Sequence, residues 1–414
     1  MEKTPQSLRL HIGLFGRTNA GKSSFLNLIC GQDIAITSEL AGTTTDIVEK
    51  AVELLPVGPV QFLDTAGVDD DSALAGKRRE KTDKAFDRAD IVVCIVEPEV
   101  WTAAEESIVN AAKKRRTPVI IVINKVDLAW PTTSFSEVCR KRTGFVMTCS
   151  SISPAGREEA LSSFKLLVQK ALADDSSATL PLIADLLPPG GIAVLVVPID
   201  LQAPRGRLIL PQVQTIRDAL DGDAAVLVVK EREYAHALKK LAAPPDLVVC
   251  DSQVVMKTIA DTPDTVACTT FSILFSRYKG DLIEQVRGLA AINKLHPGSK
   301  VLIAEACSHH ALADDIGRVK IPRWLRQYTG VKLTIDMSSG RDYPDNLTDY
   351  ALIIHCGSCM LTRRETKIRL EKAAKAGVPI TNYGLCIAMI QGVLKRALSP
   401  FPAALDAFEH RKDS

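Results

Sequence analysis

The chain has 414 residues, of which 46% are hydrophobic and 24% charged, and its formal net charge is +2. This length exceeds what one hydrophobic core usually serves, so we expect two to four domains. The near-neutral charge speaks against a nucleic-acid partner. No apolar run is long enough to cross a bilayer, and the N-terminus lacks a signal peptide's apolar run. We therefore expect a cytoplasmic protein, in which most of the ten cysteines are free thiols.

Residues 1–172 alternate short Val- and Ile-rich runs with longer helical patterns, which is typical of a parallel α/β sheet. The expected strands are Leu8–Phe15, Val60–Leu63, Ile91–Val96, Val119–Ile123 and Phe145–Thr148. A polar stretch rich in Pro and Gly, residues 173–190, then interrupts the pattern and predicts a linker.

Two smaller α/β domains are predicted after this linker, at residues 191–263 and 264–414. In the first, the expected strands are Ile192–Val197, Ala224–Val229 and Leu247–Cys250, with helices at 211–220 and 231–241. In the second, the expected strands are Lys300–Ala304, Lys332–Ile335, Ala351–Ile354 and Val378–Thr381.

A phosphate-loop motif, GRTNAGKSS, stands between the first predicted strand and a helical pattern. Its glycines let backbone N–H groups turn toward a phosphate, Lys22 supplies a positive charge, and Ser23 can hold Mg²⁺. The predicted nucleotide-binding residues of this motif are Gly16, Arg17, Thr18, Asn19, Ala20, Gly21, Lys22, Ser23 and Ser24.

Further motifs predict that the nucleotide is GTP. DTAG, at 64–67, ends a strand, as expected of a loop that senses Mg²⁺ and the γ-phosphate. NKVD, at 124–127, ends another, and the Asp127 carboxylate can accept from guanine N1–H and N2–H₂, a donor pair that adenine lacks. The predicted GTP ligands outside the phosphate loop are Asp64, Asn124, Lys125, Asp127, Ser150 and Ser151. The chain is therefore predicted to begin with a P-loop GTPase domain that has a mostly parallel sheet.

This first domain resembles the GTPases of the Era and MnmE (tRNA-modification) type. AGTTTD, at 41–46, resembles their first switch, which makes Thr44 the ligand of Mg²⁺ and the γ-phosphate, with Thr43 and Thr45 as alternatives. The implied Mg²⁺ ligands are Ser23, Thr44 and Asp64.

Asn19 matches the asparagine that holds K⁺ in these enzymes, where the cation neutralises charge between the phosphates. Its alternative role is that of a turn residue. Val68 stands where Ras-like enzymes carry a water-orienting glutamine, so we expect slow, potassium-stimulated hydrolysis suited to a switch. The expected catalytic residues are Lys22, Asn19, Thr44 and Gly67.

Three cysteines follow two predicted strands of the last domain. Cys307 stands in EACSHH, and Cys356 and Cys359 stand in HCGSC. Because parallel strands end at one sheet edge, these thiols can converge. Three kinds of site remain open on chemical grounds. The thiols could bind zinc, with His309 or His355 as fourth ligand, or hold an iron–sulfur cluster with an exchangeable position, or form a redox pair.

The paired cysteine motifs behind a potassium-type GTPase domain resemble the HydF family of FeFe-hydrogenase maturation GTPases. PITNYGLCIA, at 379–388, resembles the closing stretch of that family. The resemblance implies a 4Fe–4S cluster on Cys307, Cys356 and Cys359. The first candidate for the fourth ligand is His355 and the second is His309, and the third alternative is an open or exchangeable position.

The resemblance also implies a homodimer formed through the middle domain. The protein would be a GTP-switched scaffold that takes a transient di-iron precursor and delivers it to apo FeFe-hydrogenase. Radical-SAM maturation enzymes would be further partners. The alternative is an RNA-modification or ribosome-assembly GTPase with a zinc-binding C-terminal domain, against which stand the near-neutral charge and the lack of RNA-recognition patterns. A redox enzyme is a weaker third hypothesis.

Overall fold

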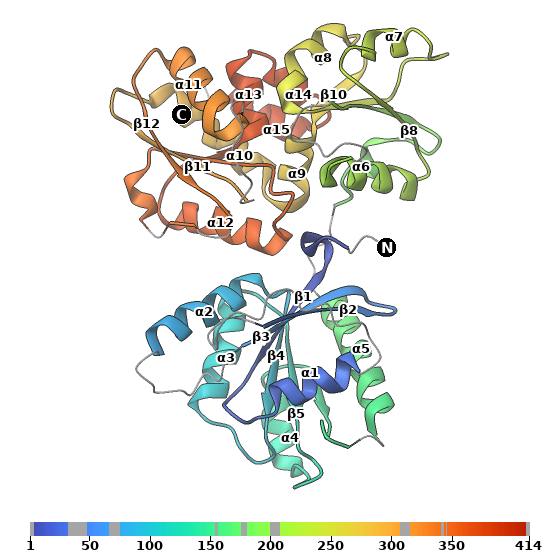
Figure 1. Ribbon diagram of the computed structural model, residues 1–414, viewed down its shortest axis with the longest axis vertical. Coiled ribbons are helices and arrows are strands. Elements are labelled where there is room, and N and C mark those ends of the chain that lie inside the picture. Colours follow the sequence, from blue (N-terminus) through green and yellow to red (C-terminus); the bar gives the residue numbers. More distant parts are fainter. Residues whose placement is uncertain are drawn as a thin grey trace. The chain divides into compact units, whose positions relative to one another are not determined.

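The computed structural model describes residues 4–31, 48–65, 75–153, 156–174, 180–198, 208–306, 315–340, 343–344 and 346–410. The chain divides into two compact units, Met1–Ala178 and Thr179–Ser414, each described by itself below (Figure 1). Within the described ranges, no helix is both long and apolar enough to cross a membrane.

The N-terminal unit contains a six-stranded sheet with the order β2-β3-β1-β4-β5-β6. Its strands are β1 (Leu10–Phe15), β2 (Val48–Leu54), β3 (Gly58–Asp64), β4 (Ile91–Val96), β5 (Val119–Ile123) and β6 (Phe145–Thr148). All neighbours are parallel except β2, which runs antiparallel to β3 at the edge. β2 was not predicted, because its sequence VEKAVEL carries three charges in seven residues rather than an apolar run.

Helices cover both faces of this sheet, as its continuously apolar strands require. One face bears α1 (Lys22–Cys30) and α5 (Arg157–Asp174), and the other bears α2 (Ala75–Arg88), α3 (Ala103–Lys114) and α4 (Thr133–Arg140). In β4, Ile91, Val93 and Ile95 pack with the first pair of helices, and the alternate residues pack with the other three. The strand period of two thus divides the core into two layers.

The C-terminal unit contains two four-stranded sheets, with the orders β10-β9-β7-β8 and β12-β11-β13-β14. All neighbouring strands in both sheets are parallel. The first comprises β7 (Ile192–Val196), β8 (Ala225–Val229), β9 (Leu247–Cys250) and β10 (Ala267–Thr270). The second comprises β11 (Lys300–Ala304), β12 (Thr334–Ser338), β13 (Leu352–His355) and β14 (Ile380–Asn382). The predicted fold class is therefore confirmed.

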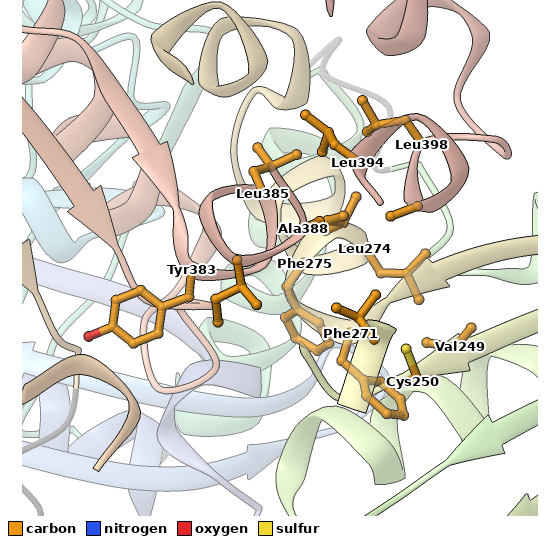
Figure 2. Close-up of a cluster of buried hydrophobic side chains, with 14 of the residues drawn as sticks. Val249, Cys250, Phe271, Leu274, Phe275, Tyr383, Leu385, Ala388, Leu394 and Leu398 are labelled. Atoms are coloured by element: carbon orange, nitrogen blue, oxygen red, sulfur yellow. The ribbon is translucent and has the colours of Figure 1, made fainter. Parts of the chain in front are cut away.

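The two sheets share one hydrophobic core. Figure 2 shows Phe271, Leu274 and Phe275 of α9 (Phe271–Lys279) gathered with Leu385 and Ala388 of α13 (Tyr383–Ile390). The other helices are α6 (Leu210–Asp221), α7 (Tyr234–Leu238), α8 (Val255–Asp261), α10 (Leu282–Gly288), α11 (Ile321–Thr329), α12 (Arg363–Lys375), α14 (Leu394–Ala397) and α15 (Pro402–Glu409).

The structure places two segment boundaries differently from the sequence-based prediction. The predicted boundary between residues 263 and 264 falls before β10, which pairs with β9 and belongs to the first sheet. β10 was missed because ACTT is short and half polar. In the predicted linker 173–190, α5 continues to Asp174, and Leu182, Ile183 and Leu187 are buried in the core of the C-terminal unit.

Candidate functional site

The phosphate loop turns from β1 into α1 at one edge of the six-stranded sheet. Asn19 and Gly21 have φ angles of 63° and 93°, in the left-handed region. Glycine is required at position 21 on steric grounds as well, because a Cβ there would lie 2.2 Å from Asn124 Nδ2. Lys22 is 9% exposed, and its Nζ donates to the carbonyl oxygens of Gly16 (3.1 Å) and Arg17 (2.8 Å). Lys22 thus binds backbone carbonyl groups of its own loop.

Two of the predicted Mg²⁺ ligands lie side by side. Ser23, in the first turn of α1, donates its hydroxyl to Asp64 Oδ2 at 2.9 Å, and Asp64 ends β3. Burial raises the pKa of Asp64, although Ser23 and the positive charge of Lys22 oppose this change. A hydroxyl beside a carboxylate is the oxygen pair that a P-loop offers to Mg²⁺. Thr44, its alternatives Thr43 and Thr45, and Gly67 lie outside the described residues.

The predicted guanine-binding residues also come together. Asn124, directly after β5, donates through Nδ2 to the Ala20 carbonyl at 3.0 Å. Its Oδ1 accepts from the Ser151 backbone N–H (3.1 Å) and hydroxyl (2.7 Å). Ser150 donates its hydroxyl to Asp127 Oδ1. Asn124 therefore ties the phosphate loop to the loop after β6.

Asp127 and Ser150 lie at one end of an open cavity of about 630 Å³ between β6 and α5. Its wall also includes Val126, Trp130 and Cys149. This size is within the usual range for small-molecule sites.

Two glutamates that were not predicted bind side chains of these loops. Glu97, directly after β4, accepts from Arg17 NH2 at 3.1 Å and from Lys125 Nζ. Glu105, fully buried in α3, accepts from Arg17 Nε at 2.7 Å. Glu97 thereby connects the phosphate loop with the guanine loop. A carboxylate directly after a strand, between two nucleotide motifs, was the available sequence signal.

The cysteine loop, defined here as residues 356–361, leaves the second sheet of the C-terminal unit at the end of β13. β13 is parallel to β11, with His355 opposite Ala304. The Cys356 N–H donates to the Ala304 carbonyl at 2.9 Å, and the Ala306 N–H donates to Cys356 Sγ at 3.1 Å. Cys356 and Cys359 are both half-buried, and neither forms a disulfide.

The third predicted cluster ligand, Cys307, and the candidate ligand His309 lie outside the described residues. Over the ranges that the structure does describe, no three His, Cys, Asp or Glu side chains gather into a metal-binding group. The convergence of the three cysteines therefore stays a prediction.

His355 is buried, and hydrogen bonds engage both of its ring nitrogens. Arg369 NH1 lies 3.0 Å from Nε2, so that nitrogen is the acceptor. Nδ1 lies 2.9 Å from the Cys356 carbonyl oxygen and 3.2 Å from the Ser358 hydroxyl. Burial, together with the positive charge of Arg369, lowers the pKa of His355 to about 3. Arg369 occupies the lone pair that a metal would need, which speaks against the expected role of His355 as fourth cluster ligand.

A buried lysine binds the opposite end of the same loop. Lys279, the last residue of α9, donates through Nζ to the carbonyl oxygens of Ser358 (3.0 Å), Cys359 (3.2 Å) and Leu361 (2.7 Å). Its exposed fraction is 2%. No local pattern around residue 279 indicates this contact, because the loop lies about eighty residues further along the chain.

Curated relatives match the N-terminal unit. The tRNA modification GTPase MnmE of Synechococcus sp. (strain JA-2-3B'a(2-13)) is 42% identical over 125 residues, covering 29% of this chain and 26% of that protein. MnmE of Lactobacillus helveticus (strain DPC 4571) is 35% identical over 165 residues, covering 39% and 34%. The chain thus spans about a third or less of the length of these relatives.

Two solved structures are similar at low identity. Aquifex aeolicus Era bound to GDP·AlF₄⁻ is 19% identical with a TM-score of 0.32, covering 56% of this chain and 98% of that chain. The G domain of the T. maritima FeoB iron transporter is 19% identical with a TM-score of 0.30, covering 39% and 99%.

Family models cover most of the chain. Residues 11–125 match a model described as 50S ribosome-binding GTPase. Residues 182–280 match the hydrogen maturase F dimerization domain, and residues 283–400 match the hydrogen maturase F tetramerization domain. These two models meet after residue 280, beyond the predicted boundary at 263. Because they follow one another behind a GTPase domain and together match more than half of the chain, the chain belongs to the hydrogen maturase F (HydF) family of GTPases.

Proposed function

We propose that this protein is a GTP-switched scaffold that carries a 4Fe–4S cluster and delivers a di-iron subcluster to apo FeFe-hydrogenase. The observation that carries the proposal is the succession of the two hydrogen maturase F domains behind a GTPase domain. The GTPase domain supports binding of GTP with Mg²⁺ and GTP hydrolysis, and the other two domains support oligomerisation.

The residues of the cysteine loop suit an iron–sulfur cluster. Cys356 and Cys359 offer soft thiolate ligands, and Cys307 is covalently joined to Ala306, whose N–H donates to Cys356 Sγ at 3.1 Å. N–H···S hydrogen bonds of this kind stabilise thiolates that hold a cluster. In the proposal Cys307, Cys356 and Cys359 are the protein ligands. When bound, the cluster supplies an iron atom to which an incoming ligand can attach.

The fourth iron position is proposed to be exchangeable or to belong to His309. His355 is assigned a structural role instead, because Arg369 and the Cys356 carbonyl oxygen engage both of its ring nitrogens. An exchangeable position is the chemistry that a carrier needs, since its cargo must arrive and leave.

The di-iron precursor is treated as cargo rather than as a resident cofactor. Radical-SAM maturation enzymes are proposed as its source and the apo-hydrogenase as its acceptor. GTP would act by changing the protein's affinity for these partners, which requires two conformations that bind them differently.

Metal analysis of anaerobically purified protein tests the cluster. We expect about four iron atoms per chain, brown colour and an electron paramagnetic resonance signal after reduction. Cys307→Ala, Cys356→Ala and Cys359→Ala should each lose most of the iron. Cys386→Ala is the matched control, because Cys386 is fully buried in α13 of the same unit. Colourless wild-type protein with one zinc per chain would refute the scaffold.

Potassium activation through Asn19 is proposed as part of the same switch. Asn19 is exposed and has a left-handed φ of 63°, a conformation that Gly also tolerates. Asn19→Gly therefore removes the amide oxygen without adding backbone strain. We expect wild-type GTP turnover to be faster in K⁺ than in Na⁺ and the variant to show no difference. Equal wild-type rates in the two salts would count against the assignment.

The second candidate function is an RNA-modification or ribosome-assembly GTPase with a zinc site. The observation in its favour is that residues 11–125 match the 50S ribosome-binding GTPase model. That model covers the GTPase domain alone, and the same metal analysis separates the two functions.

A further inference from the structure

We propose that Lys279 positions the cysteine loop and supplies the buried positive charge that balances the cluster bound there. This inference rests on the proposed iron–sulfur function. It concerns a residue outside the cysteine motifs, at the end of the helix that follows β10 of the first sheet.

The position of Lys279 follows from the fold of the C-terminal unit. α9 begins directly after β10, in the first sheet, and runs to Lys279. The cysteine loop follows β13, in the second sheet. Figure 2 shows α9 side chains packed with α13 in the core that the two sheets share, which fixes the helix from which the lysine extends.

The three hydrogen bonds hold the loop on both sides of Cys359. The Lys279 ammonium has three N–H donors, and the carbonyl oxygens of Ser358, Cys359 and Leu361 use all of them. Ser358 has a left-handed φ of 57°, so the loop adopts a conformation that a short peptide would rarely hold by itself. Lys279 thus fixes the direction in which the Cys359 side chain leaves the backbone.

Lys279 also places a positive charge in the interior of the C-terminal unit. Its exposed fraction is 2%, and the acidic groups that favour its charged form are Cys359, Glu365 and Cys356. Glu365, in the same region, accepts from the Thr362 N–H at 2.9 Å in the N-cap of α12. Burying an ammonium without a full counter-charge is costly, and carbonyl dipoles offset only part of that cost.

A cluster on three thiolates would add negative charge beside this ammonium. An oxidised 4Fe–4S core carries two positive charges, so with three thiolates the site has one net negative charge, and reduction adds a second. A nearby buried cation stabilises the reduced form more than the oxidised form. Lys279 is therefore expected to raise the reduction potential of the cluster.

A neutral structural role predicts a different result. If the loop only needed hydrogen-bond donors, a neutral donor at position 279 would leave the potential of the retained cluster unchanged. If the charge matters, Lys279→Gln and Lys279→Met should both lower the potential, and Lys279→Arg should keep it close to that of the wild type.

The experiment compares these three variants of the full-length protein after anaerobic cluster reconstitution. Iron content, redox titration followed by electron paramagnetic resonance, and thermal unfolding of the metal-free protein are measured together. We expect the neutral variants to disfavour reduction by about tenfold or more, which is 59 mV for one electron. Lys257→Met is the control, because Lys257 is exposed and donates only to the Glu231 carbonyl at 2.9 Å.

The outcomes separate the possibilities. Neutral variants that lose the cluster while Lys279→Arg keeps it would support the charge argument, provided that the metal-free proteins remain folded. Neutral variants with wild-type potential would overturn the inference and leave the proposed function standing. Loss of the cluster in Lys279→Arg as well would also overturn it. Wild-type protein that takes up no iron would instead refute the proposed function.

Discussion

Single side chains join loops of the nucleotide site that lie far apart in the sequence. Asn124 connects the phosphate loop with the loop after β6, and Glu97 connects Arg17 with Lys125. Both residues directly follow a strand, where a side chain reaches the carboxyl edge of the sheet. The motifs themselves could be predicted, because each is a short run of fixed spacing. Glu97 was missed although its place directly after β4 was a signal, and Glu105 was missed because only the packing of α3 brings it to the loop.

Asp127→Asn should abolish the preference for guanine nucleotides. The variant loses the carboxylate that accepts from N1–H and N2–H₂, and its amide can instead donate to the O2 atom of xanthine. Hydrogen bonds to a charged group contribute about 1.5–3 kcal/mol, so GTP affinity should fall roughly 10- to 150-fold. Competition binding of GTP and xanthosine triphosphate measures the change. Asp221→Asn, an exposed site in α6, is the control, and an unchanged preference for GTP in Asp127→Asn would refute the guanine assignment.

Glu105 should make the N-terminal unit sensitive to acid. Burial raises its pKa, but hydrogen bonds from Thr102 and Arg17 outweigh burial and hold the pKa below its ordinary value. As the pH falls, the unfolded chain therefore binds a proton before the folded unit does. The stability that the carboxylate contributes is present above about pH 4.3 and is lost as the pH falls through the lowered pKa.

Glu105→Gln tests this dependence. Urea unfolding should show the variant less stable than wild type at pH 7, and the difference should shrink below about pH 4. Glu137→Gln, at an exposed site in α4, controls for the loss of a carboxylate. A difference between wild type and Glu105→Gln that stays constant from pH 7 to pH 3 would contradict the role of the charged form.

The long, apolar elements could be predicted closely, whereas the short or charged ones could not. β4, β5, β6, β9 and β11 have the predicted bounds, because each is a mostly apolar run, and β4, β5 and β9 are buried along their whole length. β2 and β10 were not predicted, since the edge strand β2 carries charges and the short β10 is half polar. The boundary predicted at 263 precedes β10 for the same reason, because recognising β10 is what places residues 267–270 in the first sheet.

Gly288→Ala should destabilise the C-terminal unit. A Cβ at position 288, the end of α10, would lie 2.0 Å from the carbonyl oxygen of Ile380 in β14. Backbone atoms cannot rotate away as a side chain can, so the cost should be near the upper end for overpacking, about 3 kcal/mol. For a unit of this size that lowers the midpoint temperature by roughly 6–12 °C. Gly144→Ala is the control, because nothing lies within 4 Å of a Cβ there, and an equal shift in both variants would contradict the close packing.

At the scale of the whole molecule, the two units contain different functional motifs. The N-terminal unit contains the nucleotide motifs, and the C-terminal unit contains the cysteine loop. The cysteines could be proposed as ligands from their place after two predicted strands. The roles of Lys279 and Arg369 could not be predicted. Lys279 reaches the cysteine loop from α9 and Arg369 reaches His355 from α12, and neither helix sequence indicates a site.

Guanine nucleotide should stabilise one unit selectively in the metal-free protein. Calorimetry should resolve two transitions, and GDP with Mg²⁺ at a hundred times its dissociation constant should add about 2.7 kcal/mol to the N-terminal unit. That corresponds to a rise of roughly 5–11 °C in one transition. Gly288→Ala should move only the other transition. A single transition, or two transitions that both rise with GDP, would contradict selective stabilisation of the N-terminal unit.

β13 lies between β11 and β14 in the second sheet, although it is synthesised long after β11. When the ribosome has completed β11 and Cys307, β13 has not yet been synthesised. Cys356 and Cys359, which follow β13, do not yet exist either. The loop can form only once His355 stands opposite Ala304 and Lys279 can reach it. If the three cysteines hold a cluster as proposed, their ligand set is complete only after β13 and the cysteine loop have been synthesised.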